Sequence, residues 1–291
     1  MVLLTKLYHI ETGFKYFLFR SINMVKKRFL VLFVSLFWFI LTIPVIASPA
    51  AQNNACDDLP DHEAVRAALV AAQAEQNGGF GLHMWASVVD RDGVVCVVAF
   101  TGTERGDQWP GSRVISAQKA NTANAFSLPG LALSTANLFA ATQPGGSLFG
   151  LQESNPVDTE VAYGGRANRY GQENDPMVGE RIGGVNVFGG GLALYAEDGT
   201  LLGGIGVSGD SSCADHNIAW RTRDMLNLDY VPAGVSPTGD DNIVYDFMLD
   251  EVGNWGSPSG WGHQQCAAAA TDIANALPQT HPIGAEMGPV S

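Results

Sequence analysis

The sequence predicts an α+β fold in which helices flank an antiparallel sheet. Residues 82–89 alternate in polarity, Asp90-Arg91-Asp92-Gly93 has turn chemistry, and residues 94–100 are apolar and rich in β-formers, which together indicate a hairpin. A glycine-dense strand ends at Gly209 and runs directly into a helix that Ser211 or Ser212 can cap. These two features, with the helical spacing around them, predict a single large domain of mixed helix and strand.

The remaining elements follow from periodicity and punctuation. An Ala-rich stretch opens near Pro60 and is closed by Gly78-Gly79, which predicts the first helix. Small residues recur at helical spacing within 112–126, so this helix can lie close on a sheet. Further elements are expected as a helical piece over 131–141, a strand over 192–195, a turn at 197–199, a strand ending at Gly209, a helix through 218–226 and a short helix within 266–277.

The first 48 residues are predicted to lie outside this domain. From Met24 a basic start precedes an apolar run over 29–46 and then small residues, the order of a secretory signal with cleavage after Ala47. Residues 1–23 are then an upstream extension. The same run is just long enough to be an uncleaved anchor, the one case in which we expect a membrane partner. The expected location is periplasmic or secreted.

The charge of the chain limits its partners. Removal of residues 1–48 leaves ten basic and twenty-eight acidic side chains, and Lys119 is the only lysine that remains. Such an acidic protein repels nucleic acid and anionic lipid. We therefore expect no nucleic-acid partner.

Four cysteines follow the signal: Cys56, Cys96, Cys213 and Cys266. An oxidising compartment favours two disulfides, and no spacing typical of a zinc site is present. Three pairings are possible. Cys56–Cys96 with Cys213–Cys266 is favoured, because it would tie both ends of the chain to the core.

Three segments occur in the order typical of one family. They are Ser87-Val88-Val89-Asp90-Arg91-Asp92-Gly93, the stretch from Ser116 to Phe126, and the stretch from Asp198 to Gly209. Over residues 60–227 the chain resembles the GlcG/HbpS family, which includes exported haem-binding and haem-degrading proteins. The resemblance implies an antiparallel sheet of about five strands flanked by helices, profilin-like in layout, and assembly into homo-oligomers.

This resemblance also predicts the domain plan. Residues 49–227 form the GlcG/HbpS-like domain, into which a segment rich in Gly, Asn and Pro is inserted at 145–188. Residues 228–291 form a C-terminal extension packed on the core. Insertions of this length are usually functional or form interfaces.

Candidate site residues gather around the strand exit at Gly209. The first turn of the next helix carries His216, where the helix dipole keeps imidazole neutral and able to bind iron or accept a proton. Asp215 either caps helix N–H groups or orients His216. Lys119 and Arg113 can meet a carboxylate such as a haem propionate, although an internal salt bridge or a surface position is the alternative.

Weaker candidates complete the set. His83 lies in an alternating strand and faces either the core or a pocket, and backbone at Gly206, Ser208 and Gly209 can approach a ligand closely. His263 would come close to His216 if Cys213 and Cys266 are joined. The patterns of a nucleophile elbow and of a phosphate-binding loop are absent.

The function favoured by the sequence is an exported small-ligand-binding protein. Its expected ligand is haem or a related tetrapyrrole, with His216 or His83 as the axial ligand of the iron and Lys119 or Arg113 at the propionates. One alternative is an enzyme that acts on a small organic acid through Lys119, His216 and Asp215. The other is an oligomeric envelope protein without catalysis.

Overall fold

Four antiparallel strands form the central sheet of the computed structural model, which describes residues 56–284. The strands lie in the order β2-β1-β4-β3. Their bounds are β1 Trp85–Asp90, β2 Val95–Phe100, β3 Gly191–Tyr195 and β4 Leu201–Ser208. The predicted α+β class is confirmed. The predicted extension and signal over residues 1–48 lie outside the described residues.

The sheet has four strands where about five were expected. Loop segments, rather than a further strand, cover both of its edges. Beside β2, the Gly179 N–H donates to Val95 O and the Val95 N–H donates to Glu180 O. Beside β3, Tyr195 makes an isolated bridge to Asp229. These contacts satisfy edge groups that would otherwise be open to another chain.

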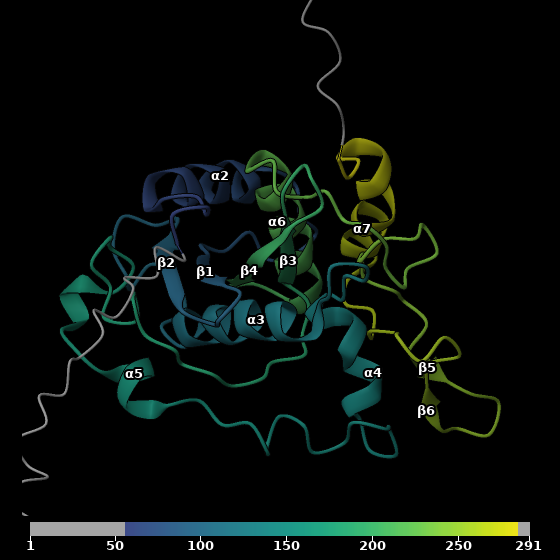
Figure 1. Cartoon of the computed structure of the whole chain (residues 1–291). Helices are drawn as coiled ribbons and strands as arrows, with labels where there is room; N and C mark the ends of the chain where they lie inside the picture. Colours follow the sequence, from purple (N-terminus) through teal and green to yellow (C-terminus); the bar gives the residue numbers. More distant parts are fainter. Residues whose placement is uncertain (1–55, 285–291) are drawn as a thin grey trace, which may run out of the picture. The chain divides into compact units, whose positions relative to one another are not determined.

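Helices cover both faces of the sheet (Figure 1). On one face lie α2 (His62–Ala74) and α6 (Ser212–Met225), and on the other lies α3 (Ser112–Phe126). Alternation along each strand divides the apolar side chains between two cores, so that Val88 packs beneath α2 and α6 whereas Val89 packs with α3. Each core therefore buries the apolar side of its helices.

The contact between α3 and β4 is unusually close because β4 presents glycines to the helix. A Cβ on Gly206 would lie only 1.9 Å from Ser116 O, and one on Gly204 would lie 2.5 Å from Ala120 O. The small residues Ala117 and Ala120 on α3 are fully buried in this contact. Backbone thus packs directly on backbone.

Residues 145–188, which the sequence predicts to be an insertion, are part of the α3 core. They contain α5 (Thr159–Tyr163) and the short 3₁₀ helix η2 (Ala167–Arg169). Met177 and Ile182 are buried against the α3 side of the sheet. Most of this segment is irregular, yet its apolar side chains fill a defined place.

The helical piece expected at 131–141 is shorter than predicted. A 3₁₀ turn, η1 (Thr135–Leu138), leads into α4 (Phe139–Thr142). Ser134 and Asn137 form a capping box that starts the turn at this point, whereas Leu128 and Leu131 pair with each other ahead of it.

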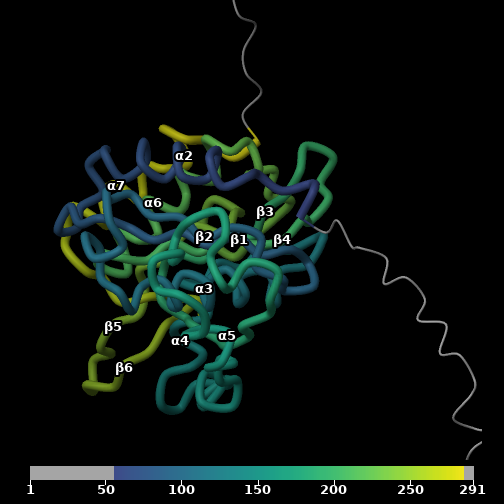
Figure 2. The backbone as a smooth tube through the Cα atoms, turned by 90° about the vertical axis from the view of Figure 1, so that its left-hand side faces the viewer, coloured from purple at the N-terminus to yellow at the C-terminus, as the bar shows by residue number. Residues whose placement is uncertain are grey.

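The C-terminal extension adds a hairpin and a helix. The two-stranded hairpin consists of β5 (Met248–Leu249) and β6 (Trp255–Gly256), and α7 (Ala268–Thr280) packs on α6. Figure 2 shows the hairpin and α4 at the same end of the molecule, away from α2. No helix within residues 56–284 is both long and apolar enough to cross a membrane.

Two disulfides join the pairs favoured from the sequence. Cys56 bonds to Cys96 on β2, and Cys213 in the first turn of α6 bonds to Cys266 just before α7. The second bond joins the C-terminal extension to α6, which packs on the sheet.

Candidate functional site

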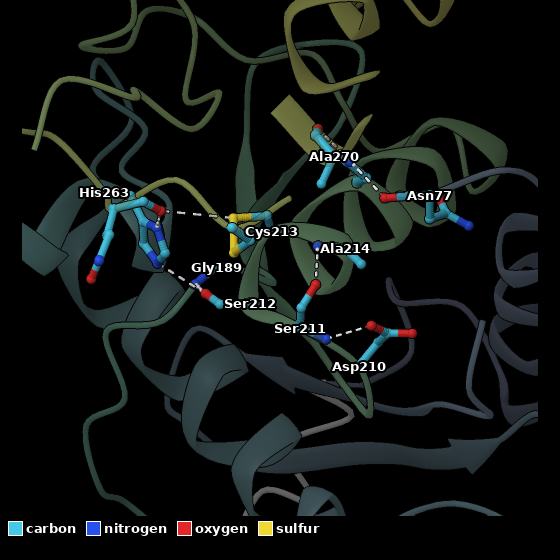
Figure 3. The surroundings of a disulfide bond; sticks show 12 residues. Asn77, Gly189, Asp210, Ser211, Ser212, Cys213, Ala214, His263 and Ala270 are labelled. Carbon is cyan, nitrogen blue, oxygen red and sulfur yellow. Dashed lines mark hydrogen bonds between the residues drawn. A yellow bond between two sulfur atoms is a disulfide. The ribbon is translucent and has the colours of Figure 1, made fainter. Parts of the chain in front are cut away.

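The junction between β4 and α6 is held by a set of short polar contacts (Figure 3). Ser211 is the N-cap of α6 and accepts the Ala214 N–H. Asp210 accepts backbone N–H groups from Phe80 and Leu82, at 2.9 and 3.1 Å, so its carboxylate fixes the loop that precedes β1. Asp210 is therefore a structural anchor for a loop rather than the helix cap.

Lys119 forms a buried ion pair with Asp215. Its Nζ lies 2.7 Å from Asp215 Oδ2 and donates to Val207 O at 3.0 Å. Asp215 Oδ1 in turn accepts the Asp210 N–H at 2.8 Å. Both charged side chains are almost wholly inaccessible to solvent, so the pair links α3 to α6 and presents neither group to a ligand.

Arg113 is engaged in the same way on the other side of α3. Its guanidinium forms a buried, two-point ion pair with Asp175, donates to Ala162 O at 2.8 Å and lies over the ring of Tyr170. All three partners belong to the inserted segment. Arg113 therefore anchors the insertion to α3.

His216 is fully buried and faces the C-terminal extension. Asn242 Nδ2 donates to Ala274 O, which turns Asn242 Oδ1 toward His216 Nε2 at 3.1 Å. Burial lowers the pKa of His216 to about 3, so the imidazole is neutral. The expected neutral state is present, but the ring lies in the core with no opening beside it.

His263 precedes α7 in the chain and lies beside the first turn of α6, next to the Cys213–Cys266 bond (Figure 3). Its Nδ1–H donates to Gln264 O at 2.6 Å, and the Ser212 hydroxyl donates to its Nε2 at 2.9 Å. Ser212 Oγ also accepts the Gly189 N–H at 2.8 Å. The Cys213–Cys266 bond thus holds His263 beside the first turn of α6, the helix that also carries His216. The two histidines are therefore neighbours, as expected from the sequence if these cysteines are joined.

His83 differs from these histidines because it is exposed. Its Nδ1 lies 3.0 Å from Thr101 Oγ1, and Thr101 Oγ1 also accepts the Met84 N–H at 2.9 Å. Among the described residues, Nε2 of His83 has no hydrogen-bond partner. This nitrogen is available to a ligand.

The glycines of the strand exit serve packing. Gly206 faces the α3 backbone, and Ser208 is buried. Gly209 adopts a φ of 154°, and a Cβ there would lie 2.6 Å from His83 O. The structure thus places α3 and the β1 entry, rather than an open cavity, over these residues.

One cleft was not predicted from the sequence. It measures about 820 Å³ and lies between α4 with the loop that follows it and the β5–β6 hairpin. Three aromatic rings line it, Phe139 from α4 and Phe247 and Trp255 from the side of the hairpin. Its two sides lie about a hundred residues apart in the chain, so no local pattern predicts that they meet. The one sequence signal for a binding site here is the aromatic, amide and glycine content of the C-terminal extension.

The one cluster of three potential metal ligands found within residues 56–284 is not a metal site. Ligand atoms of Cys56, Asp90 and Cys96 lie within 4.8 Å of one another. Both sulfur atoms, however, belong to the disulfide, and a disulfide sulfur is not the thiolate that binds metal ions.

The buried histidines make stability depend on pH. The pKa of His263 is lowered to about 4 by burial and that of His216 to about 3, so between pH 6.5 and 4 the unfolded chain binds protons that the native state does not. The contribution of these histidines to the free energy of unfolding is therefore complete above pH 6.5. It falls on acidification by about 1.4 kcal/mol per pH unit for each histidine. Burial raises the pKa of Asp215 to about 6 and also raises the pKa values of Asp224 and Asp229, which opposes this loss. Four carboxyl groups that accept hydrogen bonds have lowered pKa values, which adds to the loss on acidification: Asp107, Asp198, Asp246 and Asp250.

We expect the thermal midpoint to fall between pH 6.5 and pH 4, measured by calorimetry in a series of buffers. His263→Gln should make this decline shallower, whereas His281→Gln, at a partly exposed position, should not. A midpoint that stays constant or rises on acidification would contradict the assignment.

Comparison with known proteins gives the family. The family model described as haem degrading protein HbpS-like matches residues 60–223, more than half of the chain. No curated protein matches the chain.

Three solved structures are similar over part of the chain. PduOC in a haem complex is 26% identical, with 57% of this chain and 91% of that chain covered and a TM-score of 0.39. Klebsiella pneumoniae protein ORFY is 24% identical, with coverage of 56% and 86% and a TM-score of 0.38. HbpS is 20% identical, with coverage of 56% and 86% and a TM-score of 0.35. On the strength of the family model, the chain belongs to the HbpS-like family of haem-degrading proteins.

Proposed function

We propose that this protein binds haem or a closely related tetrapyrrole, with His83 as the axial ligand. Two observations support the proposal: the family, whose description names haem, and the free Nε2 of an exposed imidazole. Bound haem supplies an iron that accepts an imidazole nitrogen as its axial ligand. The residues of the chain must then present that nitrogen and neutralise the propionates.

The surroundings of His83 suit an axial ligand. In the tautomer with the proton on Nδ1, this N–H donates to Thr101 Oγ1, and the lone pair of Nε2 points away from that contact. A second hydrogen bond that fixes the ring is the usual companion of a metal-bound histidine. Thr101 is itself held by the Met84 N–H, so the orientation of the ring is set by β1 and by the end of β2.

A cation contacts the residue that follows Thr101, the hydrogen-bonding partner of this histidine. Arg66 on α2 is exposed and donates to Gly102 O at 3.3 Å, one residue from Thr101. Its guanidinium can turn from this long hydrogen bond to a propionate, the type of anion that arginine binds best. We assign Arg66 this role in place of Lys119 and Arg113, because both of those residues are held in buried ion pairs.

The other candidates from the sequence fit less well. His216 lies in the core with Nε2 against Asn242, so iron could reach it only if the extension moved. The alternative of an enzyme acting on an organic acid relies on His216, Lys119 and Asp215, all of them buried. Nothing in their geometry favours that reaction.

The proposal includes export and self-association. Two disulfides are typical of proteins that mature in an oxidising compartment, which supports a periplasmic or secreted location. A homo-oligomer remains the expectation from the family resemblance.

Haemin titration tests the proposal. We expect a saturable Soret shift in the parent protein and at least a tenfold loss of haemin affinity in His83→Gly, and we expect added imidazole to restore the shift in that variant. His281→Ala, which removes a half-buried histidine at the end of α7, should bind haemin as the parent does. A Soret shift that His83→Gly leaves unchanged would remove His83 as the ligand, and the absence of saturable binding by the parent would refute the function.

A further inference from the structure

We propose that the cleft between α4 and the β5–β6 hairpin binds a neutral oligosaccharide. The site lies outside the surroundings of His83, and most of one wall comes from the extension beyond the residues that match the family. It therefore provides a second binding function that does not depend on haem.

The cleft carries no charge. None of its lining residues is Asp, Glu, Lys, Arg or His, although the whole chain has a formal net charge of −13. An anionic ligand would find no cation there, and haem would find neither a propionate partner nor an iron ligand among the lining residues. The lining suits an uncharged molecule.

The cleft contains a platform of packed aromatic rings. The rings of Phe247 and Trp255 are stacked, with centroids 5.6 Å apart and planes within 12°. Phe139 meets Phe247 edge to face at 5.2 Å, and His263 supports Phe139 from behind at 4.6 Å. Trp255 is nonetheless 54% exposed, so a large apolar ring is held in place without being covered.

Polar groups with free hydrogen-bonding capacity face the same space. The Gln264 amide and the Ser147 hydroxyl have no side-chain hydrogen bonds within the described residues, and both residues are exposed. The Gln143 amide donates to Phe139 O at 3.1 Å, which fixes its side chain and leaves its oxygen free. Asn254 donates to Asp250 at 3.3 Å and likewise keeps its oxygen available.

This combination matches the chemistry of a sugar. A pyranose ring has an apolar C–H face that packs on an indole and a rim of hydroxyls that both donate and accept hydrogen bonds, so it pairs with amides and serines. The volume of about 820 Å³ lies within the range of small-molecule sites and leaves room for several rings. Fixed aromatic groups also reduce the entropy lost on binding.

Calorimetric titration of the full disulfide-bonded protein tests this site. The probes are cellohexaose, maltohexaose and the hexamer of N-acetylglucosamine, which share this chemistry but differ in linkage and substituents. We expect at least one to bind with a Kd between about 10 μM and 1 mM. A hyaluronan hexasaccharide, which is anionic, should bind more weakly than the best neutral probe.

Matched variants locate the site. Trp255→Ala should weaken sugar binding at least tenfold and Gln264→Ala about threefold, whereas Trp109→Ala, which removes another tryptophan of 54% exposure outside the cleft, should change it less than twofold. Trp255→Phe should recover part of the loss if an aromatic face is what the sugar needs. Unchanged thermal midpoints confirm that the variants are folded.

Three outcomes would overturn the proposal: no saturable heat from any neutral probe, tighter binding of hyaluronan than of all of them, or equal binding by the parent, Trp255→Ala and Gln264→Ala. Haemin binding is measured on the same samples, so failure of either site is seen independently of the other.

Discussion

Asp241→Ala is expected to lower the free energy of unfolding by about 3–5 kcal/mol. Asp241 accepts two hydrogen bonds from Arg223 on α6, at 2.7 and 2.8 Å, and the side chains of both residues are fully buried. Removal of the carboxylate leaves a guanidinium in the core, and its one remaining hydrogen-bond acceptor among the described residues is Ala193 O, at 3.1 Å. Urea unfolding followed by circular dichroism measures the change.

Two controls separate this effect from ordinary truncation. Asp92→Ala breaks an exposed pair with Arg181, 4.0 Å apart, and should cost less than about 1 kcal/mol. The double replacement Arg223→Met with Asp241→Leu should be much less harmful than Asp241→Ala, because no buried charge remains. A loss below about 1 kcal/mol in Asp241→Ala would show that Arg223 finds another partner.

Gly206→Ala is expected to cost about 3 kcal/mol or more, because its methyl group has no space. The added Cβ would lie 1.9 Å from Ser116 O and 2.5 Å from Ala120 N, both backbone atoms of α3. The helix must therefore move away from β4 and open the core on that side. For a domain of this size the thermal midpoint should fall by roughly 6–12 °C.

Gly106→Ala is the matched control, because a Cβ there meets nothing within 4 Å. Its thermal midpoint should stay close to that of the parent. If Gly206→Ala were equally stable, α3 would not pack on β4 as closely as described.

Much of the fold was predictable because its signals are local. The helix at Ser112–Phe126 was expected with these bounds, since small residues at helical spacing identify a helix that packs closely on a sheet. The hairpin was predicted from alternation around Asp90-Arg91-Asp92-Gly93. The stretch expected at 131–141 was less predictable, because the capping box of Ser134 and Asn137 selects a late and short start.

The site was harder to predict because its contacts are remote in sequence. Lys119 was expected to meet a carboxylate, but no local pattern shows that Asp215, ninety-six residues away, is the one. His216 is a good ligand in isolation and becomes a core residue only because Asn242 packs over it. For His83, strand alternation left the core and a pocket equally possible, and the contact with Thr101 shows which nitrogen is free.

The positions of the cleft-lining residues in the sequence determine when the cleft can form during synthesis of the chain. All four strands of the sheet and the residues around His83 lie before position 224, whereas one wall of the cleft begins only at Phe247. During synthesis from the N-terminus the residues of the sheet are made first, and the cleft can form only after the chain has been made as far as Gln264. An intact cleft therefore marks a chain in which the residues that follow α6 have been made and have packed against α4.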